Sequence, residues 1–247
     1  MNCTALILSI GRAPYFKTCG LKEPNFNECA KRSAIAAFPE FVKGDPKYRI
    51  PTLDPMAITE LVIQEGTSSV GSTLLARNCL MYGMKNTDIQ GVREYGLHSE
   101  YDVFFPELEI KCEYNVSGRI LLLPIIGHGN GTFLLNDVIG NYTFDYDLIK
   151  KKDGLEYAMT KNPKLVFKAK GLKIHLENLF NGDKFLGDNM NRFLNENWQD
   201  ILEDLGPAIS EALGKFIDQC LTNVFNLVPF KWAVPDYTNT TIPGSSP

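Results

Sequence analysis

The sequence lacks the features that mark several common functional classes. No apolar run reaches the roughly 18 residues of a membrane-spanning helix, so we expect no integral membrane segment. There is no long basic run, and 25 Lys and Arg residues face 29 Asp and Glu residues, which gives a net charge of -4. A chain with this balance has no electrostatic means of holding DNA or RNA, so nucleic acid is excluded as a partner.

Motifs for metal binding and catalysis are also missing. The six cysteines form no Cys-x-x-Cys or Cys–His pattern, so we expect neither a metal nor a cofactor. The stretch 66–70 lacks the second glycine of a G-x-S-x-G nucleophile elbow. His98, His128 and His175 are scattered, and none lies beside a nucleophile in the sequence. We therefore predict that the chain is not an enzyme, and a hydrolase of lipid esters is kept only as a rival hypothesis.

What the chain does have is the composition of one large globular domain. Its 247 residues are 44% hydrophobic and 22% charged. Residues 1–11 are apolar and resemble the second half of a secretory signal, although a first strand is the alternative. Residues 12–228 form the predicted domain. Residues 229–247 contain four prolines and an exposed Trp232, and we predict an extended, mobile tail.

Four sequons indicate a secreted glycoprotein. Each has the Asn-x-Ser/Thr pattern of an acceptor for N-linked glycans, which are added in the secretory pathway. We therefore predict an extracellular protein that is glycosylated at Asn115, Asn130, Asn141 and Asn239.

The cysteines support an oxidising compartment. Cys19 and Cys29 enclose nine turn-rich residues and form the natural disulfide there, worth about 2–4 kcal/mol. Cys79, Cys112 and Cys220 lie among apolar residues, which favours buried free thiols. Cys79 and Cys112 could instead pair with each other if their strands are neighbours.

Residues 58–177 have the pattern of consecutive antiparallel strands. Charged and apolar residues alternate in 108–116, as expected for a half-buried strand, and 120–126 is its return strand. Similar alternation recurs at 165–168 and 172–176. Three dipeptides give turn signals between the predicted hairpins: Gly140-Asn141, Asp153-Gly154 and Asn162-Pro163.

The sequons also predict which strand face is buried, because a glycosylated asparagine must face solvent. If Asn115 faces outward, alternate residues of its strand face inward. The charged residues at 109, 111 and 113 then face outward, in agreement with this assignment. The same reasoning applies to Asn130 and Asn141. The inward residues predicted in this way are Leu108, Ile110, Cys112, Tyr114, Leu123, Ile125, Gly127, Gly129, Tyr142 and Phe144.

Two segments have helical periodicity. In 28–43, apolar residues including Ile35, Ala36, Phe38, Phe41 and Val42 can share one face, bent at Pro39. From Asp183, a plausible N-cap, to about Leu227 an apolar stripe continues without a change of phase. We interpret this second segment as one long helix that is kinked, but not broken, at Gly206-Pro207.

The predicted length of this helix determines the fold class. It would measure about 65–70 Å, whereas a ball formed by this chain would be only about 45 Å across. A helix that is apolar along its whole length must be covered, so the sheet has to extend along it and curl around it. We therefore predict an elongated single domain of the α+β class, in which a strongly curved antiparallel sheet wraps around one long C-terminal helix.

A sheet wrapped around a helix either packs solidly or leaves an apolar cavity. Small inward residues such as Ser72, Ala76, Gly127 and Gly129 lie opposite bulky residues of the helix, where space for an apolar guest could remain. Composition alone favours the solid core.

Several motifs resemble the insect takeout and juvenile-hormone-binding-protein family. The resemblance covers roughly residues 15–228 and is most specific in the block from Lys173 to Trp198. The motifs that carry it are Thr18-Cys-Gly20, Asn25-Phe-Asn-Glu-Cys29, Ile50-Pro-Thr-Leu-Asp-Pro55, Ile120-Leu-Leu-Leu-Pro-Ile125, Lys173-Ile-His-Leu-Glu-Asn-Leu-Phe-Asn-Gly-Asp183 and Phe193-Leu-Asn-Glu-Asn-Trp198.

This resemblance implies a fold and a function. It implies the tubular lipid-binding fold, secretion, and carriage of small hydrophobic molecules in haemolymph or chemosensory tissue, with links to feeding, circadian and hormone signalling. It places the family's first disulfide on Cys19 and Cys29. Juvenile-hormone-binding proteins proper have a second disulfide that does not transfer to the remaining cysteines, which favours the takeout-like branch.

We expect the ligand to lie in a tunnel lined by inward side chains. Tyr114 could orient the polar end of a ligand, although a core tyrosine bonded to the backbone is the alternative. His175 lies in the most specific block, and a structural hydrogen bond is its favoured role. The predicted lining residues are Phe38, Phe41, Leu74, Met81, Ile110, Tyr114, Leu123, Ile125, Tyr142, Phe144, Phe193, Leu194 and Trp198.

The sequence therefore predicts a secreted, monomeric, non-enzymatic carrier. Its ligand would be a terpenoid, a fatty acid or a related lipid, bound mainly by burial of apolar surface. The alternative is a secreted signalling protein with a filled core that acts on an unknown receptor through its outer surface.

Overall fold

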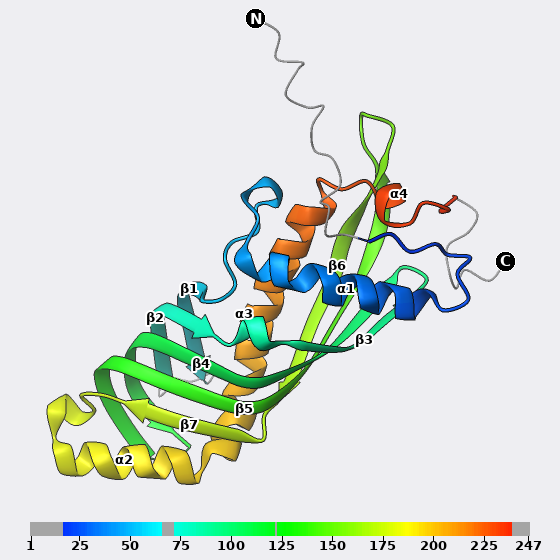
Figure 1. Ribbon diagram of the computed structural model, residues 1–247. Helices are drawn as coiled ribbons and strands as arrows, with labels where there is room; N and C mark the ends of the chain where they lie inside the picture. Colours follow the sequence, from blue (N-terminus) through cyan, green and yellow to red (C-terminus); the bar gives the residue numbers. More distant parts are fainter. Residues whose placement is uncertain (1–16, 66–71, 122, 239–247) are drawn as a thin grey trace, which may run out of the picture.

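A seven-stranded antiparallel sheet and a long C-terminal helix make up most of the computed structural model (Figure 1). The structure describes residues 17–65, 72–121 and 123–238. The predicted strand region, 58–177, is confirmed. The strands are β1 (Met56–Glu65), β2 (Ser72–Tyr82), β3 (Asp88–Tyr95), β4 (His98–Ile120), β5 (Leu123–Lys150), β6 (Glu156–Lys168) and β7 (Gly171–Leu176).

The long strands β4 and β5 give the sheet two halves. Both are continuous, with 23 and 28 residues, and they pair with each other along their whole length. At one end they are flanked by β2 and β1 on one side and by β7 on the other. At the other end they are flanked by β3 and β6. This arrangement produces the elongated shape that the sequence predicts (Figure 1).

The inward residues of β4 and β5 change parity midway along the strands. In β4 they have even numbers at one end and an odd number at the other. At the first end β4 buries Cys112, Tyr114 and Val116 and exposes Asn115, as predicted. At the other end the buried position of β4 is Ser99, which has the opposite parity. The change occurs near Asp137 of β5, whose φ of 49° is left-handed. Alternation therefore predicts which residues are buried within each half of the strands, but not across both halves.

Only one of the three predicted turns is a turn. Gly154 has a φ of 80° and lies in the connection between β5 and β6. Gly140 instead lies within β5, where an added Cβ would meet the side chain of Val103 at 3.0 Å. This glycine provides space rather than a bend. The Asn162-Pro163 pair lies within β6, at an irregularity in its pairing with β5.

Helix α1 (Phe26–Lys43) lies across the β3 side of the sheet (Figure 1). Its predicted extent, 28–43, is close to the observed one, and Pro39 lies inside it. Val42 is buried and Phe38 and Phe41 are half-buried, but Ile35 is 46% exposed and Ala36 is also exposed. The buried face is therefore narrower than predicted. Short 3-10 turns follow at Pro46–Tyr48 (η1), Met84–Asn86 (η2) and Phe180–Gly182 (η3).

The single long C-terminal helix that we predicted is two helices. They are α2 (Lys184–Glu196) and α3 (Trp198–Phe225), and α3 alone is about 42 Å long. The break is at Asn197, whose φ of -116° and ψ of 28° are not helical and whose side chain bonds the Phe193 carbonyl at 2.8 Å. Because only one residue interrupts the helices, the apolar stripe keeps its phase. Pro207, the predicted kink, lies inside α3.

Helix α2 is held against the free edge of the sheet by two asparagines. Asn191 accepts from the Leu176 N–H at 2.8 Å and donates to its carbonyl at 2.9 Å. One turn later, Asn195 accepts from the Ile174 N–H at 2.9 Å and donates to its carbonyl at 2.7 Å. Each amide thus makes the pair of backbone hydrogen bonds that a residue of a neighbouring strand would make. In this way α2 covers the edge that β7 would otherwise expose.

The predicted start of the C-terminal helical region at Asp183 is confirmed. This start lies in the block from Lys173 to Trp198, where the family resemblance is most specific. The Asp183 side chain caps α2 by accepting from the Leu186 N–H at 3.0 Å. His175 faces away from the sheet interior and is exposed. The structural hydrogen bond that we favoured for His175 is therefore not among the observed bonds, and the asparagines have that role.

Two disulfides are present in the described part of the chain. The predicted Cys19–Cys29 bond is present. Cys79 and Cys112 are also bonded, because β2 and β4 are neighbours. The preference for free thiols was therefore wrong for this pair and right for Cys220, which is free and buried.

The first part of the predicted tail is packed against the body. Residues 230–233 form the short helix α4, and Pro229 and Val234 are buried. Asp236 accepts from the backbone N–H groups of Leu21 at 2.7 Å and Lys22 at 3.0 Å. The expectation of an extended segment is corrected for 229–238, because the loop around Cys19 supplies backbone donors that this segment satisfies. Residues 1–16 and 239–247, with the predicted signal and Asn239, lie outside the described residues.

Replacing Asn195 with alanine should lower the free energy of unfolding by about 1–3 kcal/mol. The substitution removes two bonds to the backbone of Ile174 and leaves its N–H and carbonyl without protein partners at a partly buried edge. Chemical denaturation measures the change. Asn189→Ala is the matched control, because Asn189 is on the same helix and bonds only within it. Equal stability of both variants would contradict the proposed closure of the edge.

Candidate functional site between the sheet and helix α3

The sheet curls so that its edges approach α3. At the end that contains β1, β2 and β7, the helix lies closest to the edge strands β7 and β1. At the other end it lies closest to β6, and α1 covers β3. The central strands β4 and β5 span the space between these edges. We call the region between the inward face of the sheet and these helices the interior.

One large apolar cluster fills the first end of this interior. Its buried members come from α1, β1, β2, β4, β5, β7, α2, the start of α3 and two connecting segments, and the half-buried ones include aromatic residues of α1 and α2. Ten of the thirteen predicted lining residues belong to it: Phe38, Phe41, Leu74, Met81, Ile110, Tyr114, Ile125, Phe193, Leu194 and Trp198.

The other three predicted lining residues lie elsewhere. Tyr142 and Phe144 belong to a second cluster at the opposite end of the interior. Leu123 is 39% exposed at the start of β5 and does not face the interior. Alternation predicts an inward Leu123, but this residue directly follows the turn between β4 and β5, where the pattern of burial has not yet begun.

Helix α3 presents an apolar stripe that is only partly covered. Of its 28 residues, only Ile201, Gly214, Cys220 and Val224 are fully buried. The apolar side chains that face the main cluster retain accessible surface, although they lie between a helix and a sheet. A solidly packed interface would bury such residues completely. The half-buried members are Trp198, Leu202, Leu205, Leu213 and Phe216.

Tyr114 is a buried core residue whose hydroxyl bonds the backbone. Its hydroxyl donates to the Glu177 carbonyl, which is the alternative that the sequence left open. Burial, followed by the charge of Glu177, raises the pKa of Tyr114 to about 12. Gly127 lies against this tyrosine, since an added Cβ would be 2.8 Å from its hydroxyl and 3.0 Å from Leu179. The glycine-rich stretch thus allows the backbone to approach closely.

The second cluster is aromatic. Phe144, which is 1% exposed, is at its centre, and Tyr101 is stacked on it at 6.1 Å between ring centroids. Tyr142, Tyr146 and Phe225 surround Phe144 at 5.8, 6.3 and 6.1 Å. The fully buried residues therefore change from mainly aliphatic at one end to aromatic and hydroxyl-bearing at the other.

A buried carboxyl group lies beside this aromatic cluster. Ser99 donates to Glu94 at 2.7 Å, and Asn27 of α1 accepts from the Glu94 backbone N–H at 3.0 Å. Burial raises the pKa of Glu94 to about 7, and the Ser99 hydrogen bond and the charge of His98 offset part of the shift. Sequence reasoning missed Glu94 because the pairing of β3 with β4 shifts between Ile89 and Gly91, which disrupts simple alternation.

The outer face of the same strands holds an ionic network. Arg93 bonds Glu100 at 2.7 Å and also bonds Asp102. His98 bonds Asp145 at 2.7 Å, and this bond is the main cause of the raised pKa of His98. Ser99 is the next residue, but it points to the opposite face of the sheet. This serine and histidine therefore do not form a nucleophile–base pair.

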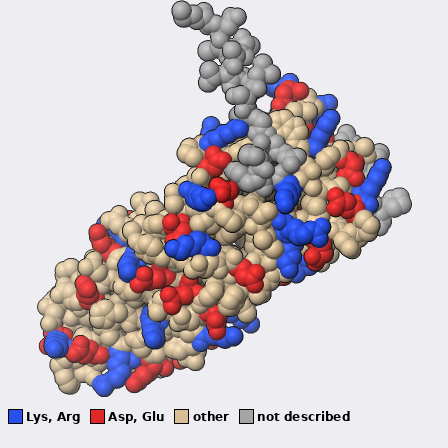
Figure 2. Space-filling view, in the orientation of Figure 1, with Lys and Arg blue, Asp and Glu red and all other residues tan. Residues whose placement is uncertain are grey.

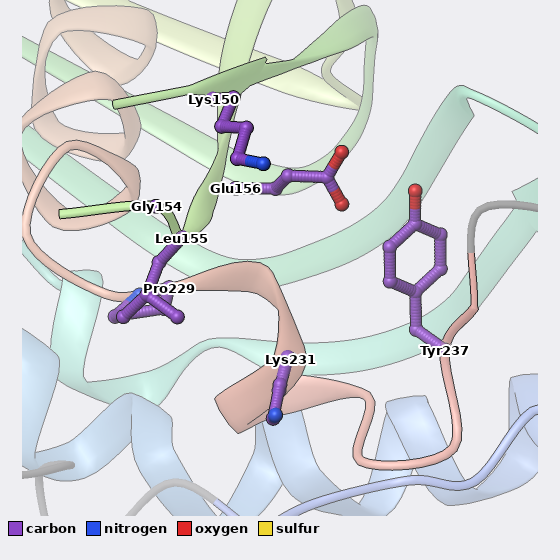
Figure 3. Close-up of a pocket in the computed structure, with 7 residues that line it drawn as sticks. All are labelled: Lys150, Gly154, Leu155, Glu156, Pro229, Lys231 and Tyr237. Atoms are coloured by element: carbon purple, nitrogen blue, oxygen red, sulfur yellow. The ribbon is translucent and has the colours of Figure 1, made fainter. Parts of the chain in front are cut away.

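A surface pocket of about 250 Å³ lies between the β5–β6 hairpin and the C-terminal segment (Figure 3). Two lysines, a glutamate and a tyrosine project into it, and burial, followed by the charge of Glu156, raises the pKa of Tyr237. This lining is too polar for an apolar ligand. The lining residues are Lys150, Gly154, Leu155, Glu156, Pro229, Lys231 and Tyr237.

Three predicted glycosylation sites lie on the outer face of β4 and β5. Asn115 and Asn130 are exposed, and the Asn130 amide donates to Glu177 at 3.0 Å. Asn141 is half-buried, and its amide donates to Asp102 at 2.7 Å. The side-chain nitrogen that would carry a glycan is thus already bonded at two sites.

Charges of both signs are mixed on the visible face of the molecule. On the face in Figure 2, Lys and Arg residues are interspersed with Asp and Glu residues. None of the described helices is long and apolar enough to cross a membrane. Within the described ranges, no group of three His, Cys, Asp or Glu side chains could hold a metal ion.

Comparison with known proteins identifies the family. Residues 2–235 match the family described as haemolymph juvenile hormone binding protein (JHBP). The chain belongs to this family. The match extends through α4, so for the JHBP family the domain includes part of the segment that we predicted to be a tail.

Relatives within the JHBP family agree with the takeout-like fold. The chain is 30% identical over 184 residues to the circadian clock-controlled protein daywake of Drosophila melanogaster, covering 70% of this chain and 69% of that protein. Its Drosophila yakuba counterpart is 28% identical over 182 residues, covering the same shares of the two chains. The crystal structure of Takeout 1 from Epiphyas postvittana matches with a TM-score of 0.79 and 26% identity, covering 88% of this chain and 98% of that one. The predicted fold class is confirmed.

Glu94→Gln should stabilise the protein above pH 7 by about 3 kcal/mol and leave stability unchanged below about pH 4.5. The folded pKa of Glu94, about 7, is above its ordinary value of 4.5, so the folded state binds this proton more tightly. The contribution of Glu94 is therefore fully present below pH 4.5 and is lost as the pH rises to 7. Thermal unfolding at several pH values measures the effect.

The exposed Glu203 of α3 provides the control for this experiment. Glu203→Gln should leave the pH dependence of the wild type unchanged. A wild type and a Glu94→Gln variant whose stabilities stay parallel from pH 4 to pH 8 would show that Glu94 is not held in a buried site.

Proposed function

We propose that this protein binds a small lipophilic molecule in the interior between the sheet and helix α3. The observation that carries the proposal is the partly covered apolar stripe of α3, which faces an apolar sheet surface whose edges approach the helix. Transfer of apolar surface from water into such a space is favourable by roughly 25 cal/mol per Å². The residues that would contact the ligand are those of the main cluster.

The family supports the same function. JHBP proteins are named for hormone binding in haemolymph, and members of this family bind hydrophobic ligands rather than catalyse reactions. We therefore infer a non-enzymatic carrier for a terpenoid, a fatty acid or a related lipid. The similarity to daywake, described as circadian clock-controlled, supports a role in signalling.

We also infer that the protein is secreted and acts as a monomer. The two disulfides need an oxidising compartment, and the exposed sequons at Asn115 and Asn130 could accept glycans there. In the rival function the interior is filled and a receptor binds the outer surface. The two functions differ in one property, which is whether the interior has room for a guest.

Leu205→Trp should lower the affinity for an apolar fluorescent probe at least tenfold while keeping the melting temperature near that of the wild type. If the interior is hollow, the indole occupies space that the probe would use. If it is solid, the larger side chain overpacks the core and costs about 1–3 kcal/mol. Probe titration and thermal unfolding of delipidated protein measure both quantities.

Leu186→Trp is the matched control, because Leu186 is 46% exposed on α2. It should change neither the affinity for the probe nor the stability. Absence of probe uptake by the wild type, together with destabilisation by Leu205→Trp, would favour the receptor-binding function instead.

A further inference from the structure

Two polar atoms in the aromatic half of the interior have no hydrogen-bond partner among the described residues. They are the hydroxyl of Tyr142 on β5 and the Oδ1 atom of Asp218 on α3. Both atoms are buried, and Tyr142 as a whole is 5% exposed. Leaving a buried donor or acceptor without a partner costs about 1–3 kcal/mol, so such groups require an explanation.

The two groups are neighbours, but they do not bond each other. Burial, followed by the negative charge of Asp218, raises the pKa of Tyr142. Their elements meet here because Gly214, one turn before Asp218, lets α3 approach Leu165, which is paired with Tyr142. A group placed between the hydroxyl and the carboxylate could bond both.

The surroundings of this pair are otherwise aromatic and apolar. Tyr101 is paired directly with Tyr142 across β4 and β5 and is half-buried, and its hydroxyl has no hydrogen bond in the described part of the chain. Other buried hydroxyl groups nearby are already bonded: Tyr146 donates to the Gly96 carbonyl at 3.3 Å and Ser99 donates to Glu94 at 2.7 Å. The side chains here that still have groups free to hydrogen-bond are therefore Tyr142, Asp218 and Tyr101.

The inward face of β5 continues from this pair toward the apolar end of the interior. Along β5 the inward positions after Tyr142 are Gly140, which has no side chain, and then Val138 of the main cluster, roughly 13 Å away. Along α3 the distance from Asp218 to Leu205 is about 20 Å. A molecule with its polar end at Tyr142 would thus have its tail among the half-buried aliphatic residues.

We propose that Tyr142 and Asp218 bind the hydroxyl group of a lipid alcohol whose tail occupies the aliphatic end. A hydroxyl group donates one hydrogen bond and accepts others, so it can donate to Asp218 and accept from Tyr142. This proposal rests on the proposed lipid-binding function and specifies its ligand class.

The same pair disfavours other lipid head groups. An ether or ester oxygen only accepts, so it would satisfy Tyr142 and leave Asp218 without a partner. A fatty acid anion would bring a second negative charge beside Asp218 in a poorly solvated site. The alcohol is therefore preferred over the ether and the fatty acid of the same chain length.

Competition titrations of a bound apolar probe with dodecanol, dodecyl methyl ether and dodecanoate test the proposal. The wild type should bind dodecanol about tenfold more tightly than either of the other ligands. Asp218→Leu should remove the preference for the alcohol over the ether, because only the alcohol donates to Asp218. Tyr142→Phe should instead weaken binding of both ligands, because both accept from its hydroxyl. Asp218→Asn should reduce the preference for the alcohol over dodecanoate, because the repelling charge is gone.

Tyr146→Phe is the matched control. Tyr146 belongs to the same aromatic cluster, but its hydroxyl already donates to Gly96, so the variant should keep the order of the three ligands. Equal affinity for dodecanol and the ether in the wild type, with normal probe uptake, would overturn this inference, since a water molecule would then occupy the pair. Absence of probe uptake in all proteins would instead refute the lipid-binding function itself.

Discussion

The need to cover the inward face of a long, curled sheet is the constraint on which the rest of the structure depends. Strands β4 and β5 extend through the whole molecule, and neither half of their inward face could remain in contact with water. Helix α3 covers this face by lying near the edge strands β1, β7 and β6, while the central strands stand further from it. Because α3 lies near the edge strands, its apolar stripe stays partly accessible, and this is the physical basis of the proposed binding interior.

Polar groups close one end of this interior and make the other end less apolar. Asn191 and Asn195 satisfy the free edge of β7, so α2 can end the tube without an unpaired strand. At the opposite end, Glu94, Tyr142 and Asp218 lie inside a wall that is otherwise aromatic. The interior is therefore amphipathic along its length, as would suit a ligand with one polar end.

The sequence predicted the class of fold and most of the inward residues of the strands, because both follow from hydrophobic periodicity. It placed the strands, α1 and the cap at Asp183, and ten of the residues predicted to line a tunnel meet in one cluster. It did not reveal the break at Asn197, since one non-helical residue leaves the apolar phase unchanged. Glu94 was also missed, because the irregular pairing of β3 hides it, and the Tyr142–Asp218 pair depends on tertiary contact that periodicity does not encode.

The central claim, that a lipophilic molecule binds inside and not on the surface, is tested most directly by tryptophan quenching. The chain has two tryptophans: Trp198 packs against the main cluster, and Trp232 lies in the C-terminal segment. A brominated lipid should quench the fluorescence of Trp198 in a Trp232→Phe variant in a saturable manner, and should leave Trp232 unquenched in a Trp198→Phe variant. Quenching of Trp232 alone, or of neither residue, would contradict the account.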